Sequence, residues 1–273
     1  MKKIFVVLII PFLIAGISGL SSCKNRSETK QRDEQEKEQY RTIERELEKN
    51  IYEIPSSANI IKMLTDLEVG YIIGLTNPVE NVRKYFTSSA RAINLGVYGA
   101  DLSYTTLYNQ EQKVIDYMDA IRSVANELNM SAIYDAKLYD SIKVNYDNKE
   151  SLVNILTNAF NKSYEYLSEN DQQPLALLTA GGAWVEGMYL TTNVSEAAYN
   201  VATIAKILID QKNSFMLYLD LTKPYMDNPA VSEFVNNLAP IKTVYDGLGT
   251  SLTEKNLADI KEAMAIIRNK IIQ

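Results

Sequence analysis

Apolar residues recur at every third or fourth position along most of this chain, which is the spacing of one face of an α-helix. The pattern is clearest over 114–128 and 257–271, and it starts as early as Tyr40, where Ile43, Leu47 and Ile51 follow at the same spacing. No segment with the strict polar–apolar alternation of a β-strand is longer than a few residues. The pattern therefore predicts an all-α protein.

Residues that commonly begin helices stand before several of these apolar runs, because their side chains can accept a hydrogen bond from a free backbone N–H. They are Asn77, Asn109, Ser131, Asn148, Asn228 and Thr253. We expect Asn77 to begin one helix that carries Tyr85 and Phe86 on its inner face. We also expect one helix from Asn228 to near Gly247. The prediction is a single domain, 40–273, of about nine or ten antiparallel helices with short connections.

Two glycine-rich segments resemble each other at an offset of 85 residues. They are GVYGADLSYTTLY at 96–108 and GGAWVEGMYLTTN at 181–193. The offset aligns Gly96 with Gly181 and Asp101 with Glu186, and outside these segments the match fades. The alternatives are the duplication of a unit of several helices, which would make the domain resemble a helical repeat, and a chance likeness.

The two acids of these segments form a candidate site with their aromatic neighbours. Residues three apart share one face of a helix, so Asp101 lies beside Tyr98 and Tyr104, and Glu186 lies beside Tyr189. If the two helices face each other, the acids meet in a tyrosine-lined cleft. The candidate ligand-binding residues are Asp101, Tyr98, Tyr104, Trp184, Glu186 and Tyr189.

Three interpretations of the acid pair remain open from the sequence. Two carboxylates on either side of a sugar bond would form a glycoside hydrolase. Alternatively, the acids bind a cation, a sugar or a peptide without turnover. The third interpretation is structural: each acid bonds to a tyrosine or the backbone, and the glycines let helices pack closely. Glycine inside a helix costs up to ~1 kcal/mol relative to alanine, and close packing compensates for that cost, which favours the structural interpretation.

Composition limits the chemistry. The chain has no histidine, which excludes catalytic triads of the Ser-His-Asp or Cys-His type and removes the commonest metal ligand. The sequence NYDNKE at 145–150 lacks the glycine and the spacing of a calcium loop. We therefore predict no enzymatic activity, no metal and no cofactor. The net charge of −6, without a basic block, also predicts no nucleic-acid binding.

The first 23 residues have the order of features of an export signal. Lys2 and Lys3 precede about 17 apolar residues, and the run ends in Leu20-Ser21-Ser22-Cys23. This end resembles the lipobox of bacterial lipoproteins. The resemblance implies that 1–22 is a signal peptide and that Cys23, the only cysteine, carries the lipid. Removing 1–22 takes away two lysines and no acid, so the net charge becomes −8.

The resemblance also implies a location. Bacterial lipoproteins that are retained in the inner membrane often carry Asp directly after the lipidated cysteine. This chain has Lys24 at that position, which favours the outer membrane. We expect the protein to face the periplasm, with exposure at the cell surface as the alternative. Residues 23–39 lack aliphatic and aromatic side chains after Cys23 and are predicted to be a flexible tether. The expected function is a non-catalytic binding or scaffold protein whose partner is an envelope protein or a small ligand.

Overall fold

The computed structural model describes residues 70–195, 201–249 and 252–273, which all belong to one compact unit. The predicted signal peptide, the tether and the helix expected from Tyr40 lie outside these residues. Within them every regular element is an α-helix or a 3₁₀ helix, and no strand is present. The all-α prediction is confirmed.

The described elements follow one another with short connections. They are η1 (Val79–Lys84), α3 (Ser88–Leu107), α4 (Glu111–Glu127), α5 (Ala136–Val144), α6 (Lys149–Glu169), α7 (Gln173–Ser195), α8 (Val201–Thr222), η2 (Lys223–Tyr225), α9 (Pro229–Asn237), α10 (Ala239–Asp246) and α11 (Glu254–Ile271). None of the helices in the described ranges is both long enough and apolar enough to cross a bilayer.

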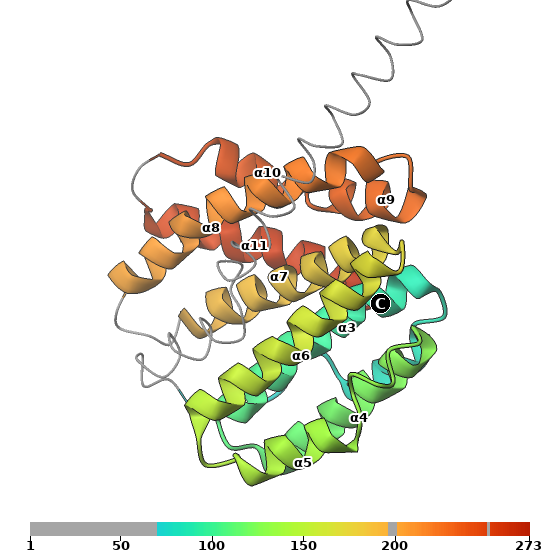
Figure 1. Ribbon diagram of the computed structural model, residues 1–273. Helices are drawn as coiled ribbons and strands as arrows, with labels where there is room; N and C mark the ends of the chain where they lie inside the picture. The colour runs from blue at the N-terminus through green and yellow to red at the C-terminus, as the bar shows by residue number, and fades with distance from the viewer. Residues whose placement is uncertain (1–69, 196–200, 250–251) are drawn as a thin grey trace, which may run out of the picture. The chain divides into compact units, whose positions relative to one another are not determined.

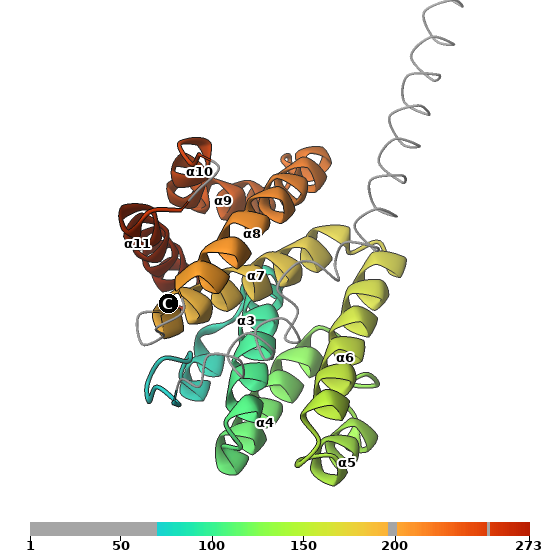
Figure 2. The same ribbon diagram turned by 90° about the vertical axis from the view of Figure 1, so that its left-hand side faces the viewer.

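Helix α7 is the centre of this arrangement. In Figures 1 and 2 it lies between one group formed by α3 to α6 and another formed by α8 to α11. It packs against α3, α6, α8, α9 and α11, so it is covered on several sides. Its sequence explains this position, because it is apolar around most of its circumference and contains no lysine or arginine.

The glycines bring the backbones of α3 and α7 into direct contact. A Cβ added at Gly96 would overlap the carbonyl oxygen of Thr179 and lie 2.6 Å from the amide nitrogen of Ala183. A Cβ at Gly182 would overlap the carbonyl oxygen of Ile93. At Gly99, in contrast, an added Cβ would meet nothing within 4 Å. The packing role expected for these glycines therefore holds at Gly96 and Gly182 but not at Gly99.

Three of the predicted helix starts are confirmed by their hydrogen bonds. The side chain of Asn148 accepts a bond from the amide of Ser151 at the start of α6, and Asn228 accepts from two amides at the start of α9. Thr253 forms a reciprocal capping box with Asn256 at the start of α11. These caps depend only on neighbours in the sequence.

The prediction of one continuous helix that starts at Asn77 is wrong. Residues 79–84 form the 3₁₀ helix η1, Tyr85 is extended, and α3 starts only after its cap, Thr87. The side chain of Asn77 cannot cap a helix because it is bonded within the core. The break also turns Phe86 outward, where 78% of its surface is exposed, although we expected it to face inward.

Three other predicted boundaries are also wrong. Asn109 adopts a left-handed conformation, with φ 52°, in the turn before α4 instead of capping that helix. Asp135, not Ser131, caps α5. The helix predicted from Asn228 to Gly247 is divided into α9 and α10, because Pro240 has no N–H to continue the hydrogen bonds of α9.

Candidate functional site

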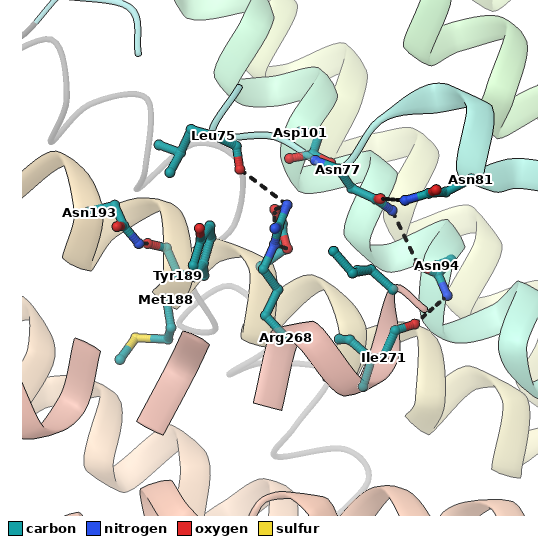
Figure 3. A network of polar contacts seen from close by, with 12 residues as sticks. Leu75, Asn77, Asn81, Asn94, Asp101, Met188, Tyr189, Asn193, Arg268 and Ile271 are labelled. Carbon is teal, nitrogen blue, oxygen red and sulfur yellow. Dashed lines mark hydrogen bonds and ion pairs between the residues drawn. The ribbon is translucent and has the colours of Figure 1, made fainter. Parts of the chain in front are cut away.

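The contact between α3 and α7 brings Asp101 and Glu186 together in the core. Both side chains have 0% of their surface exposed. They are joined there by Arg268 of α11 and by the 75–77 segment, which precedes η1 (Figure 3). Segments that are far apart in the sequence thus meet at two carboxyl groups and one guanidinium group.

Glu186 and Arg268 form a buried ion pair with several hydrogen bonds. The Nε atom of Arg268 donates to both carboxylate oxygens of Glu186, at 3.1 and 2.9 Å, and its Nη2 atom donates to Oε1 at 3.0 Å. Nη2 also donates to the backbone oxygen of Leu75 at 3.1 Å. Burial lowers the pKa of Arg268, but the charge and hydrogen bonds of Glu186 raise it more, so the guanidinium group stays protonated.

Tyr189 provides one side of the arginine's environment. Its ring lies 4.3 Å from the guanidinium carbon of Arg268, within the range of a cation–π contact. Figure 3 shows Tyr189 on one flank of Arg268, with Asp101 and Asn77 on the other. The guanidinium group is therefore enclosed by a carboxylate, a backbone carbonyl and an aromatic ring.

Asp101 is bonded on one side only. Its Oδ2 atom accepts a hydrogen bond from the amide of Asn77 at 3.1 Å, while Oδ1 is buried with no donor facing it. Burial raises the pKa of Asp101 well above its ordinary value, and the negative charge of Glu186 raises it further. Arg268 acts in the opposite direction but does not cancel these effects.

An asparagine network extends this polar core towards the C-terminal end of α11. The Nδ2 atom of Asn77 donates to the hydroxyl of Tyr85 at 3.0 Å, and its side-chain oxygen accepts from Asn81 at 2.7 Å. Asn94 of α3 donates to the backbone oxygen of Ile271 at 2.8 Å. Asn77 also donates to the side-chain oxygen of Asn94 at 3.5 Å. Figure 3 shows the bonds of Asn77 with Asn81 and Asn94 and the bond of Asn94 with Ile271, which together fasten the segment before α3 and the last turn of α11 to α3.

The other predicted site residues have partners elsewhere. The hydroxyl of Tyr98 donates to the backbone oxygen of Pro78 at 3.2 Å, and that of Tyr104 accepts from the amide of Ile72 at 2.9 Å. Trp184 donates to Gln211 of α8 at 3.1 Å. The structure thus brings Asp101, Glu186 and Tyr189 together around Arg268. It places Trp184 on the α8 side of α7.

Sequence reasoning missed two of the central residues, Arg268 and Asn77. Arg268 follows Met264 by four positions and precedes Ile271 by three, so it stands on the apolar face of α11. A single arginine on such a face is a signal for a buried carboxylate partner, and it was available in the sequence. Asn77 was interpreted as a helix cap, and only the fold reveals its role in the core.

This arrangement is a closed polar core. Neither Asp101 nor Glu186 is accessible to solvent, and the glycosidase interpretation needs two carboxyls facing a sugar in an open cleft. Within the described residues, no group of three or more His, Cys, Asp or Glu side chains is arranged to hold a metal ion. What the site does chemically in this conformation is to join α3, α7, α11 and the 75–77 segment.

Comparison of the chain with protein-family models, with curated proteins and with solved structures found no match.

Proposed function

We propose that this protein is a lipid-anchored lipoprotein of the bacterial cell envelope, acting as a non-catalytic binding or scaffold protein. The observation that carries the proposal is the ordered N-terminal sequence: two lysines, an apolar run, and then Leu20-Ser21-Ser22-Cys23. Cys23 is the residue that would bear the lipid. Acyl chains contribute about 0.8 kcal/mol per buried CH₂ group, so several together hold a protein firmly to a membrane.

The helical part supports a non-catalytic role. The sequence contains no histidine, so acid–base chemistry would depend on carboxylates, lysine or tyrosine. The acid pair that the sequence suggested for this purpose is occupied: Glu186 by Arg268, and Asp101 by the amide of Asn77. Among the described residues, large apolar side chains are instead exposed at Ile73 and Phe86, and such side chains suit contact with another protein.

The proposal is tested first at the anchor. In a bacterial host that processes lipoproteins, we expect the native chain to incorporate labelled palmitate and to sediment with the outer membrane. Cys23→Ser should lose the label and leave the membrane fraction, whereas Ser27→Ala, in the predicted tether, should behave as the native chain. If Cys23→Ser remains in the membrane, the lipoprotein assignment is wrong.

A second measurement separates a scaffold from a small-ligand site at the acid pair. The protein is heated with calcium chloride, N-acetylglucosamine or a tetra-alanine peptide, and its unfolding temperature is compared with that of the Asp101→Asn variant. A ligand at 100 times its dissociation constant stabilises a protein by ~2.7 kcal/mol. A stabilisation that disappears in the variant would replace the scaffold proposal with ligand binding at this site.

A further inference from the structure

The environment of Asp101 leaves one atom to be explained. Asp101 is fully buried, and only Oδ2 has a hydrogen-bond donor, the amide of Asn77. Buried polar atoms are almost always hydrogen-bonded, since an unmet bond costs free energy. After burial, the carboxyl group of Glu186 has the largest effect on Asp101: its negative charge raises the pKa of Asp101, and a side-chain hydrogen bond with it raises this pKa further. Two carboxyl groups can form a hydrogen bond only when one of them carries a proton.

The charges around the site lead to the same conclusion. The groups that face Asp101 from the packed elements are Glu186 of α7, Arg268 of α11, Tyr117 of α4, Tyr98 of α3, and Tyr71 and Tyr85 from the segment before α3. Burial raises the pKa of all four tyrosines above the ordinary value of 10.0, so they are neutral near pH 7. Arg268 is the one buried cation among the described residues, and it is already paired with Glu186.

A second negative charge on Asp101 would therefore have no partner of its own. Leaving a charge uncompensated in the core is costly, so a buried carboxyl group in this position takes up a proton instead. With a proton on Oδ1, every polar atom of the pair has a partner: Oδ1–H donates to Glu186, Oδ2 accepts from Asn77, and Glu186 also accepts from Arg268. The site then contains one positive and one negative charge.

We propose that Asp101 and Glu186 hold one proton between them, and that this carboxyl pair is a proton-binding site which latches the 75–77 segment onto the helices. The latch consists of two bonds: Asn77 N–H to Asp101, and Arg268 to the backbone oxygen of Leu75. Loss of the proton places two negative charges beside one guanidinium group in a buried site, which destabilises the folded arrangement as a whole, although the bond from the Asn77 amide by itself favours the charged form of Asp101. The site therefore stabilises the fold most at low pH, and its contribution is lost as the pH rises.

The direction of the pH effect follows from linkage. The pKa of Asp101 is higher in the folded chain than in the unfolded chain, so between these two values the folded chain binds a proton that the unfolded chain has released. Stability from this site is complete below the unfolded pKa of about 4 and is lost as the pH rises through the folded value. In this window the unfolding equilibrium constant increases about tenfold per pH unit.

The experiment is urea unfolding of the full chain in a mild non-ionic detergent between pH 5 and pH 8. We expect the native unfolding constant to rise by about tenfold per pH unit until Asp101 loses its proton. In Asp101→Asn the amide group takes the place of the protonated acid, donating to Glu186 and accepting from Asn77, so this rise should be absent. Asp259→Asn, which changes an exposed acid of α11 paired with Lys255, should keep the native pH dependence.

Infrared spectroscopy tests the proton directly. At pH 5, the low end of the same range, the native chain should show the carbonyl band of a protonated, non-aqueous carboxylic acid, and Asp101→Asn should lack it. If Asp101→Asn does not fold, Glu186→Gln serves instead, because it frees Arg268 to pair with an ionised Asp101 and should also remove the band. A native chain without this band, or equal pH slopes in the native chain and Asp101→Asn, would overturn the proposal.

Discussion

At the scale of single residues, the Glu186–Arg268 pair shows how a buried charge is tolerated. Each ion loses its hydration on burial, at a cost of several kcal/mol, and the ion pair with its hydrogen bonds offsets that cost. Arg268 distributes its donors between the carboxylate of Glu186 and the carbonyl of Leu75, and its face is covered by Tyr189. The pair fixes the position of α11 on α7 because each ion needs the other.

Removal of one ion should therefore destabilise the protein much more than removal of both. We expect Arg268→Met to lower the unfolding free energy by about 3–5 kcal/mol, since it leaves Glu186 buried without its cation. The double variant Arg268→Met with Glu186→Leu should recover most of this loss. Lys242→Met, which breaks the exposed pair between Lys242 and Asp246, should cost at most about 0.5 kcal/mol. Urea unfolding measures all three.

The same residues show why part of the candidate site was visible in the sequence. The offset between the two glycine segments placed Asp101 and Glu186 in equivalent positions, and the structure brings them together. Of their partners, Asn77 precedes α3 in the sequence, and Arg268 follows α7 by more than 70 residues. Such pairings depend on the tertiary arrangement, and no local pattern records them.

At the scale of elements, two glycines of α3 differ in what they contribute to the contact with α7. Gly96 allows the backbones to approach, while Gly99, one turn further along α3, faces open space. Both are in the same helix, so they have the same cost in helix propensity. A comparison of alanine variants at Gly96 and Gly99 therefore separates the effect of close helix packing from the effect of backbone flexibility.

We expect Gly96→Ala and Gly99→Ala to have opposite effects on stability. The methyl group at position 96 overlaps the backbone of α7 and should destabilise the protein by about 1–3 kcal/mol. At position 99 the methyl group has room, and the better helix propensity of alanine should stabilise it by up to ~1 kcal/mol. Thermal unfolding followed by circular dichroism gives both values. Equal changes in the two variants would show that the glycines do not set the contact between α3 and α7.

Some helix boundaries are set by neighbours in the sequence, and others are set by tertiary contacts. The caps Asn148, Asn228 and Thr253 were correctly predicted because a capping side chain bonds to an amide two or three residues away. Asn77 has the same chemical preference, but bonds to Tyr85 and Asn81 in the core compete with capping. The sequence therefore predicts where a cap is available, and tertiary contacts decide whether it is used.

At the scale of the whole molecule, the central position of α7 makes the described helices depend on one another. This helix contacts α3 and α6 on one side and α8, α9 and α11 on the other. The bond from Arg268 to Leu75 connects α11 with the 75–77 segment, and the bond from Asn94 to Ile271 connects α3 with the end of α11. Neither group of helices can therefore leave without exposing the apolar surface of α7.

We expect the helices to unfold in one cooperative transition, and Trp184 provides the probe. It is the only tryptophan, and it stacks on Phe215 between α7 and α8, with ring centroids 5.1 Å apart. Its fluorescence reports on the α8 side, whereas circular dichroism at far-ultraviolet wavelengths reports on all helices. The two urea transitions should coincide, and Gly96→Ala, on the α3 side, should move both midpoints equally. If Gly96→Ala lowers the circular dichroism midpoint and leaves the Trp184 midpoint unchanged, the two groups of helices unfold independently, and α7 does not unite them.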